Sequence, residues 1–487
     1  MHAIQDHPAT DYSHLPLRIL QFGEGNFLRA FADWMIDKAN ETGVFTGSIA
    51  VVKPRPGALT AFGAQGNRYT VIARGLRDGR VVREARLVTS IARTIDPYED
   101  FPAFLRLARC DTLELVLSNT TEAGLSLSPD DRSDDAPPAS FPAKLTRLLF
   151  ERYRHFQGAA DKGLYCLPLE LLPENGRKLE SCVHALIHHW SLPEAFAAWV
   201  RDSCCFCDTL VDRIVSGFPA EEAPALWEEL GYADRLLTVC EPYALWAVED
   251  RGDVRRRLPL NVAGLPVQFV PAVAPLRERK TRLLNGAHTL LAAVGLTADI
   301  QTVGDCMSTP VVAAFLRRCL QEEILPHTPG LPAENRLFQT AMLERFSNPC
   351  LEHRLASISL NALSKWRARL LPTLEAAWAA EGALPPGLLL AFAVQLHGLL
   401  FPPPGMETAL SGEPTAAAAF FGDWAPALRT GAASWPEFAE AAAAQTAFWG
   451  TDLRRYPGLA PTVAAHLSVL SQQGLPALLQ PYLEETT

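Results

Sequence analysis

The first strongly patterned segment of the chain is an apolar strand that runs directly into a two-glycine turn and a helix. It reads R-I-L-Q-F-G-E-G-N-F-L-R-A over residues 18–30. Gly23 permits a tight turn, Gly25 lets a phosphate approach the backbone, and the helix presents N–H groups that bind an anion. Leu28 replaces the third glycine of the usual dinucleotide fingerprint. The segment predicts a nucleotide-binding α/β fold, although a strand-to-helix turn without a ligand has the same pattern.

The next segments continue the alternation of strand and helix. Apolar periodicity predicts a helix over 26–42 and a buried strand over 48–52, which completes a βαβ unit. Two alternating stretches, 68–74 and 80–90, flank a turn at Asp78-Gly79 and predict a hairpin. We expect this hairpin to be an antiparallel insertion on a parallel sheet.

A second candidate binding segment follows a later strand. The stretch 112–117 is mostly apolar and ends in Ser118, Asn119 and Thr120. Ligands of open α/β sheets bind at the carboxyl ends of the strands. Asn119 and Thr120 are therefore candidate cofactor contacts.

The chain is long enough for two domains. At 487 residues it exceeds the size at which one hydrophobic core stops growing. Strand signals almost vanish after residue 273, where alanine and leucine recur at helical spacing. We predict an α/β Rossmann-type dinucleotide-binding domain over 1–272 and a mostly α-helical substrate and catalytic domain over 273–487.

Charge and hydropathy exclude several classes of partner. The net charge of −10 gives no footprint for nucleic acid or for an acidic membrane. The most apolar run, 384–401, is interrupted by prolines, Gln395 and His397, so we expect a buried helix and no membrane span. Residues 1–14 resemble no targeting peptide, which predicts a cytoplasmic protein. The expected partner is a small-molecule substrate, and the oligomeric state is left open.

The ten cysteines predict neither disulfides nor a metal site. Cys204 and Cys207 form one C-x-x-C pair, but no second pair follows as in a structural zinc site. Reduced, buried thiols are the expected state, and no metal is predicted.

A short segment of the second domain offers the groups for acid/base chemistry. Lys280, Asn285 and His288 supply a proton carrier, an amide donor and an imidazole. A lysine whose pKa is lowered by burial or neighbouring cations can exchange a proton with a substrate hydroxyl, and an amide N–H can stabilise an oxyanion. On an α-helix Asn285 and His288 share a face, whereas Lys280 lies about 140° from Asn285. A solvated basic segment followed by a packed histidine is the alternative.

The loop after the second strand bears on the choice of cofactor. An acidic residue that binds the adenosine ribose is expected there, but the chain has Lys53 and Arg55. By that rule alone, two cations permit a 2′-phosphate and hence NADP.

These motifs together resemble the mannitol dehydrogenase family, the polyol-specific long-chain dehydrogenases and reductases. The spacing of Lys280, Asn285 and His288 is similar to the family signature, and Gly23-x-Gly25-x-Phe27-x-Arg29 is similar to its variant fingerprint. The resemblance implies a metal-independent reaction with Lys280 as general acid/base, Asn285 in the oxyanion hole and His288 on a substrate hydroxyl. It also implies that NAD is bound by Ile19, Leu20, Gln21, Phe22, Gly23, Glu24, Gly25, Asn26, Phe27, Leu28, Arg29 and Ala30.

Several segments look like one branch of that family, whose members interconvert an aldonate and a keto-uronate in hexuronate breakdown with NAD. They are residues 21–30, 118–124, 134–137, 141–152 and 284–289. We follow the resemblance and expect NAD. In the polyol dehydrogenases a second asparagine precedes a Val-Asp-Arg-Ile sequence, and Asp208 takes its place here.

A keto-uronate carries a carboxylate, which requires a cation in the site. The basic stretch 353–369 resembles a substrate-side segment of the family, and within it we expect Lys365 first and Arg369 second to bind the carboxylate. A basic helix face in solvent is the alternative. The wider alternatives are a stereoisomeric keto-uronate, a polyol such as mannitol or arabinitol, and a non-catalytic NADH-binding sensor.

Overall fold

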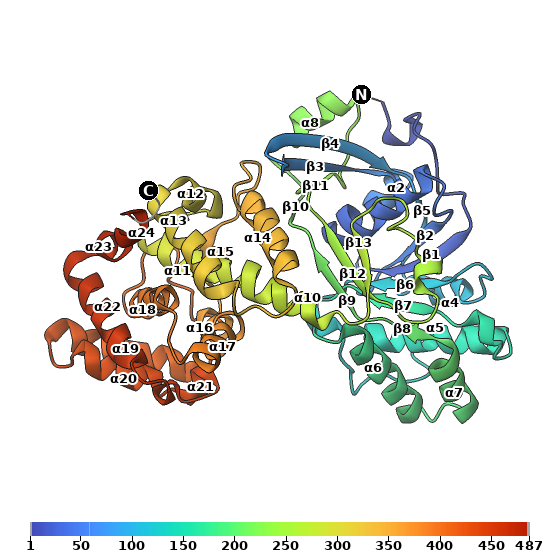
Figure 1. Cartoon of the computed structure of the whole chain (residues 1–487). Helices are drawn as coiled ribbons and strands as arrows, with labels where there is room; N and C mark the ends of the chain where they lie inside the picture. Colours follow the sequence, from blue (N-terminus) through green and yellow to red (C-terminus); the bar gives the residue numbers. More distant parts are fainter. Residues whose placement is uncertain (1, 58, 485–487) are drawn as a thin grey trace. The chain divides into compact units, whose positions relative to one another are not determined.

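The computed structural model describes residues 2–57 and 59–484, and the chain forms two compact units, 1–274 and 275–487 (Figure 1). The first unit contains a six-stranded sheet in the order β5-β2-β1-β6-β7-β8, with every neighbouring pair parallel. When the strands of this sheet alone are numbered along the chain, their order is 3-2-1-4-5-6, the doubly wound Rossmann order. The direction of this order reverses between β1 and β6. The strands are β1 (Leu17–Phe22), β2 (Ser48–Val52), β5 (Ile91–Ile95), β6 (Leu115–Ser118), β7 (Tyr165–Pro168) and β8 (Cys205–Phe206).

Both faces of this sheet are covered, which explains why its strands are apolar throughout. In β1, Ile19 packs on one face and Leu20 and Phe22 on the other, as strand geometry requires. The face with Leu20 packs against α4 (Phe101–Leu107), α5 (Phe141–His155), α6 (Asn175–His189) and α7 (Glu194–Ser203). The face with Ile19 packs against α2 (Trp34–Glu41).

The helix predicted over 26–42 is present but contains a π-helical turn. It consists of α1 (Asn26–Leu28), the π turn η2 (Arg29–Asp33) and α2. π turns are rare and occur frequently at functional sites. The remaining helices of the unit are η1 (Ile4–Asp6), α3 (Thr60–Ala64), η3 (Glu122–Gly124), η4 (Ala160–Lys162), α8 (Ala223–Leu230) and α9 (Val254–Arg257).

The hairpin is formed by β3 (Tyr69–Arg77) and β4 (Arg80–Val88), but its expected place on the parallel sheet is wrong. Asp78 and Gly79 at the turn both have positive φ, as a two-residue hairpin turn requires. β3 also pairs with β11 (Thr238–Cys240), which pairs with β10 (Val215–Gly217), so the hairpin belongs to a separate four-stranded sheet. A third sheet contains β9 (Thr209–Asp212), β12 (Leu245–Glu249) and β13 (Val267–Val270).

The second unit is helical and has no strand within residues 275–484. This confirms the predicted fold class of an α/β Rossmann-type N-terminal part and a mostly α-helical C-terminal part. Its elements are α10 (Ala274–Arg279), η5 (Lys280–Asn285), α11 (Gly286–Thr297), α12 (Val303–Ser308), α13 (Pro310–Arg318), η6 (Cys319–Ile324), α14 (Pro332–Phe346), α15 (Leu355–Ser359), α16 (Ala362–Arg369), α17 (Leu371–Glu381), α18 (Pro386–Leu400), α19 (Thr415–Thr430), α20 (Trp435–Ala443), α21 (Thr446–Trp449), η7 (Leu453–Arg455), α22 (Leu459–Gln473), α23 (Leu475–Leu479) and α24 (Pro481–Glu484).

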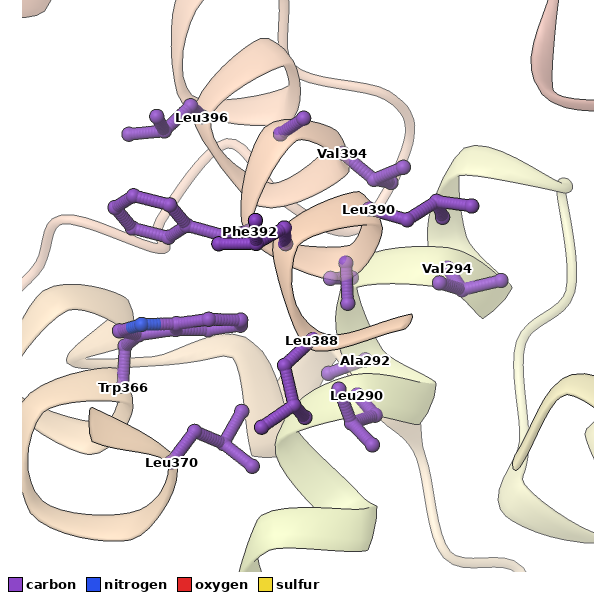
Figure 2. Close-up of a cluster of buried hydrophobic side chains, with 14 of the residues drawn as sticks. Leu290, Ala292, Val294, Trp366, Leu370, Leu388, Leu390, Phe392, Val394 and Leu396 are labelled. Carbon is purple, nitrogen blue, oxygen red and sulfur yellow. The ribbon is translucent and has the colours of Figure 1, made fainter. Parts of the chain in front are cut away.

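Three helices, α11, α16 and α18, form the centre of this unit (Figure 2). Leu290 and Val294 of α11 are fully buried with Leu388 and Phe392 of α18. Trp366 of α16 stacks on Phe392 with ring centroids 4.9 Å apart, as Figure 2 shows. The core therefore holds α11, which carries His288 and continues from η5 with Lys280 and Asn285, and α16, which carries Lys365 and Arg369. Among the described residues, no helix has both the length and the apolar character needed to span a bilayer.

Candidate active site

The glycine turn, residues 23–25, connects β1 to α1. Gly23 has φ +125°, and a Cβ there would lie 2.9 Å from Leu28 Cδ1 and 3.3 Å from the Asn119 carbonyl oxygen. Gly25 has an ordinary φ of −70°, and a Cβ there would meet nothing within 4 Å. Gly23 is therefore required by the fold, whereas the exposed backbone of Gly25 faces open space from which a phosphate can approach.

The predicted cofactor segment divides into an accessible turn and a buried support. Glu24, Gly25, Asn26 and Phe27 are partly or fully exposed, and the other members of the segment 19–30 are buried. The guanidinium of Arg29 donates hydrogen bonds to the Glu24 carbonyl at 2.9 Å, to Thr238 Oγ1 at 3.1 Å and to Asn26 Oδ1. These hydrogen bonds support a role for Arg29 in holding the glycine turn in its conformation.

The carboxyl end of β6 lies beside the glycine turn. The Asn119 N–H donates to the Phe22 carbonyl at 3.1 Å, and its side chain donates to the Leu169 carbonyl at 2.8 Å. Asn119 and Thr120 thus lie at the edge where the strand order reverses, which is where sheets of this type bind ligands.

Glu170 organises this edge, and sequence reasoning missed it. Its buried carboxylate accepts hydrogen bonds from the Thr120 N–H and Thr120 Oγ1, both at 2.9 Å, and from Ser118 Oγ at 3.0 Å. Burial raises the pKa of Glu170. Its position after the apolar strand 165–168 was the available signal, because carboxyl ends of parallel strands share one edge.

The backbone after Thr120 is strained. Thr121 has φ +100°, which is unusual for a β-branched residue and costs about 1–3 kcal/mol. Arg55 stabilises this conformation by donating to the Thr120 carbonyl at 3.2 Å and to Thr121 Oγ1 at 3.1 Å. Such strain concentrates at functional sites, which supports a binding role for this loop.

Replacing Glu170 with leucine is expected to lower the free energy of unfolding by about 2 kcal/mol, because the buried Thr120 N–H loses its acceptor. Denaturant unfolding measures this loss, and fluorescence titration should show weaker NADH binding. Glu170→Gln is the matched control, since its carbonyl still accepts from Thr120 and its amide can donate to Ser118. Equal losses of unfolding free energy in Glu170→Leu and Glu170→Gln would contradict the role of the Glu170 carboxylate in holding Thr120.

In the helical unit, the π turn η5 changes the expected angle between Lys280 and Asn285. The prediction of about 140° assumed an α-helix and is wrong, because residues 280–285 form a π turn. A π turn closes i→i+5, so residues five apart lie close to one turn from each other. Lys280 is thereby brought toward the side of Asn285, and Asn285 shares a face with His288.

His288 is the most enclosed polar group of the predicted site. Its ring stacks on Phe346 at 4.5 Å and meets the ring of His353 edge-on at 4.7 Å. The side chain is buried, and its Nε2 atom has no hydrogen-bond partner within the described residues. Nε2 of His288 is thus a buried polar atom without a partner among the described residues, and the contact with Phe346 was not foreseen from the sequence.

The surroundings of His288 keep its imidazole neutral. Burial lowers the pKa of His288 well below its usual value, and the charges of His353, Arg345, Arg369 and Lys280 lower it further. The charge of Lys280 is thus one of those that act on the His288 imidazole. A neutral imidazole can exchange a hydrogen bond with a hydroxyl and does not carry a proton at neutral pH.

The lowered pKa of His288 predicts a pH effect on stability. Below about pH 6.5 the unfolded chain protonates this histidine while the folded chain does not, so stability is lost as pH falls. We expect the decrease in Tm from about pH 7.5 to pH 5 to be smaller in His288→Gln than in the wild type. Replacement of the exposed His189 by Gln is the control. Parallel Tm curves for wild type and His288→Gln would contradict this assignment.

The predicted substrate cations lie on α16, beside α11. Arg369 Nη1 donates to Thr289 Oγ1 at 3.2 Å and lies 3.5 Å from the Asn285 carbonyl oxygen. Lys365 Nζ donates to the Ile358 carbonyl at 2.8 Å, and Lys365 and Thr289 line the same small cavity. Burial lowers the pKa of Arg369 to about 10, and burial with the nearby Arg369 charge lowers the pKa of Lys365 to about 8.

Asp208, where the resemblance would place a second oxyanion donor, caps the N-terminus of α6. Its Oδ1 atom accepts from the N–H groups of Gly176 at 2.9 Å and Arg177 at 3.1 Å, and its Oδ2 atom pairs with the Arg177 guanidinium. An ionised carboxylate has no proton to donate to an oxyanion.

Across the described residues, no three His, Cys, Asp or Glu side chains are grouped to hold a metal ion, and the ten cysteines are unpaired.

Comparisons with known proteins agree with both units. The model of the mannitol dehydrogenase Rossmann domain matches residues 17–262, and that of the mannitol dehydrogenase C-terminal domain matches residues 272–399. Altronate oxidoreductase of Klebsiella pneumoniae subsp. pneumoniae is 41% identical over 480 residues, which is 98% of each chain. Altronate oxidoreductase of Yersinia enterocolitica is 40% identical over 96% of this chain and 97% of its own.

Solved structures share the fold. Pseudomonas fluorescens mannitol 2-dehydrogenase, in a ternary complex with NAD and D-mannitol, has a TM-score of 0.71 at 21% identity and covers 98% of this chain and 96% of its own. A substrate-free D-sorbitol dehydrogenase has a TM-score of 0.81 at 20% identity, with 97% and 96% covered. The full-length identity and the two domain matches establish that the chain belongs to the mannitol dehydrogenase family.

Proposed function

We propose that the protein is an NAD-dependent oxidoreductase that interconverts D-altronate and D-tagaturonate in hexuronate breakdown. The observation that carries this proposal is the group of cations, Lys365, Arg369 and Arg345, around the segment that holds Lys280, Asn285 and His288. A sugar acid needs such cations for its carboxylate, whereas a neutral polyol does not. The names of the full-length relatives support the same substrate.

The roles of the site residues follow from their chemistry. Lys280 gives a proton to the oxygen of the keto carbon during reduction and takes it back during oxidation of the alcohol. The Asn285 amide donates to the negative charge that develops on that oxygen. His288, neutral and with Nε2 unpartnered within the described residues, contacts a substrate hydroxyl and orients the sugar.

The first unit fits a dinucleotide. The partly or fully exposed residues of the turn are Glu24 and Gly25, which precede α1, and Asn26 and Phe27, which begin it. The N–H groups of α1 bind the pyrophosphate, and Asn119 and Thr120 lie beside this turn at the carboxyl end of β6. Hydride chemistry comes from NADH when it is bound. The buried members of segment 19–30 hold the turn in shape.

Lys365 gives this proposal a pH signature. Because its pKa is about 8, the ammonium is charged below that pH and loses its proton above it. We expect the KM for D-tagaturonate to rise above about pH 8, and Lys365→Arg, which stays charged, to remove that rise. Lys365→Met keeps the stem and removes the charge, so its KM should be about tenfold higher at pH 7. An unchanged KM in Lys365→Met would remove Lys365 from the carboxylate site.

Oxidation assays test the substrate class. The purified protein is mixed with NAD⁺ and either D-altronate, D-mannitol or D-arabinitol, and NADH formation is followed. NADH formation with altronate alone supports the proposal. Turnover of the polyols and not of altronate would indicate a polyol dehydrogenase. No turnover of any of these compounds, together with tight NADH binding in a separate fluorescence titration, would indicate a sensor.

A further inference from the structure

An ion pair joins the glycine turn to the end of β2. Lys53 is the first residue after β2, where Rossmann domains that bind NAD place an acid for the ribose 2′-hydroxyl. Its Nζ atom lies 2.7 Å from Oε1 of Glu24, the residue between the two glycines of the turn. The chain thus brings a carboxylate to the end of β2 from the end of β1.

The structure fixes Lys53 toward this partner. Only 11% of its side chain is exposed. Gly57 has φ +149°, and a Cβ there would lie 2.8 Å from Lys53 Cε, so the loop 54–57 closes over the lysine stem. Arg55, the other cation of this loop, donates to the Thr120 carbonyl and to Thr121 Oγ1. Both cations that suggested a 2′-phosphate site are therefore engaged by the protein.

Glu24 retains the capacity to bind a hydroxyl. Its side chain is 29% exposed, and its Oε2 atom accepts no hydrogen bond from residues 2–57 or 59–484. A carboxylate oxygen in this place can accept a hydrogen bond from a ribose 2′-hydroxyl. It would repel a 2′-phosphate, which carries negative charge.

We propose that Glu24 determines the preference for a dinucleotide with a free 2′-hydroxyl, NAD, over its 2′-phosphorylated form, NADP. Glu24 neutralises Lys53 and supplies the carboxylate that β2 lacks. The inference rests on the proposed function, because it requires that the first unit binds a nicotinamide dinucleotide. It reverses the conclusion drawn from Lys53 and Arg55 alone.

Binding titrations of NADH and NADPH without any sugar test this proposal. In Glu24→Gln, which keeps the size and removes the charge, Lys53 is released to pair with a 2′-phosphate. The ratio of Kd for NADPH to Kd for NADH should fall about tenfold or more. Adding Lys53→Met to Glu24→Gln should abolish most of this gain, because the released cation is gone.

Glu84→Gln is the matched control. It breaks another lysine–glutamate pair of the same unit, Lys38 Nζ to Glu84 Oε1 at 2.8 Å, away from the glycine turn. Its NADPH to NADH ratio should equal that of the wild type. An unchanged ratio in Glu24→Gln, with NADH still bound by the wild type, would overturn the role of Glu24. A wild-type protein that binds neither dinucleotide would instead overturn the proposed function.

Discussion

Replacing Lys280 with alanine is expected to lower kcat for D-tagaturonate reduction by about 10²–10⁴-fold, because the reaction loses its proton donor. The Kd for NADH should change little, since the residues proposed to hold NADH lie in residues 1–274. Steady-state kinetics give kcat, and fluorescence titration gives the Kd. The two measurements together separate a catalytic role from a structural one.

Two further variants make the Lys280 result specific. Lys280→Arg keeps a positive charge but does not release its proton at working pH, so it should not restore kcat. Replacing the exposed Lys178 by alanine removes a lysine far along the sequence in α6 and should leave kcat unchanged. A Lys280→Ala enzyme that keeps most of its kcat, or that loses NADH binding in proportion, would contradict the acid/base assignment.

Replacing Gly25 with alanine is expected to raise the Kd for NADH by about tenfold or more. The new methyl group would stand between the backbone N–H groups and the pyrophosphate and lengthen charge-assisted hydrogen bonds, each of which contributes about 1.5–3 kcal/mol. The fold should tolerate it, because φ is ordinary and a Cβ there meets nothing within 4 Å. An unchanged Tm with a weaker Kd is therefore the predicted result.

Two glycine variants complete the test. Gly422→Ala adds a methyl group to open space on α19, where the higher helix propensity of alanine should raise Tm slightly, and it should leave the Kd for NADH unchanged. Gly23→Ala should lower both stability and affinity, because φ +125° and the contacts with Leu28 and Asn119 exclude a Cβ. If Gly25→Ala bound NADH as tightly as the wild type, the cofactor would not approach the glycine turn.

Local pattern was sufficient to predict the elements that begin the fold. The strand at 48–52 has the predicted bounds, and β1 begins one residue before the predicted start at Arg18. Both strands are short, apolar and followed by turn residues, so their structure depends mainly on neighbours in sequence. The partner of β3 could not be predicted in this way, because β11 lies far along the chain and pairing depends on the folded unit.

The site shows the same limit. The spacing of Lys280, Asn285 and His288 identified the segment. The π turn that changes the direction of Lys280 could not be predicted, because the residues of this turn are equally compatible with an α-helix. The contacts of His288 with Phe346, and of Glu170 with Thr120, join segments that only tertiary packing brings together. Similarly, the charges of Lys53 and Arg55 suggested a phosphate site until Glu24 and Thr121 were seen to engage them.

The most direct test of the proposed function is kcat/KM for NADH oxidation with D-tagaturonate and with D-fructuronate, measured side by side on the purified protein. We predict a strong preference for tagaturonate, the keto form of altronate. A preference for fructuronate would make the protein a D-mannonate oxidoreductase with the same site chemistry. No turnover with either keto-uronate would contradict the proposed activity.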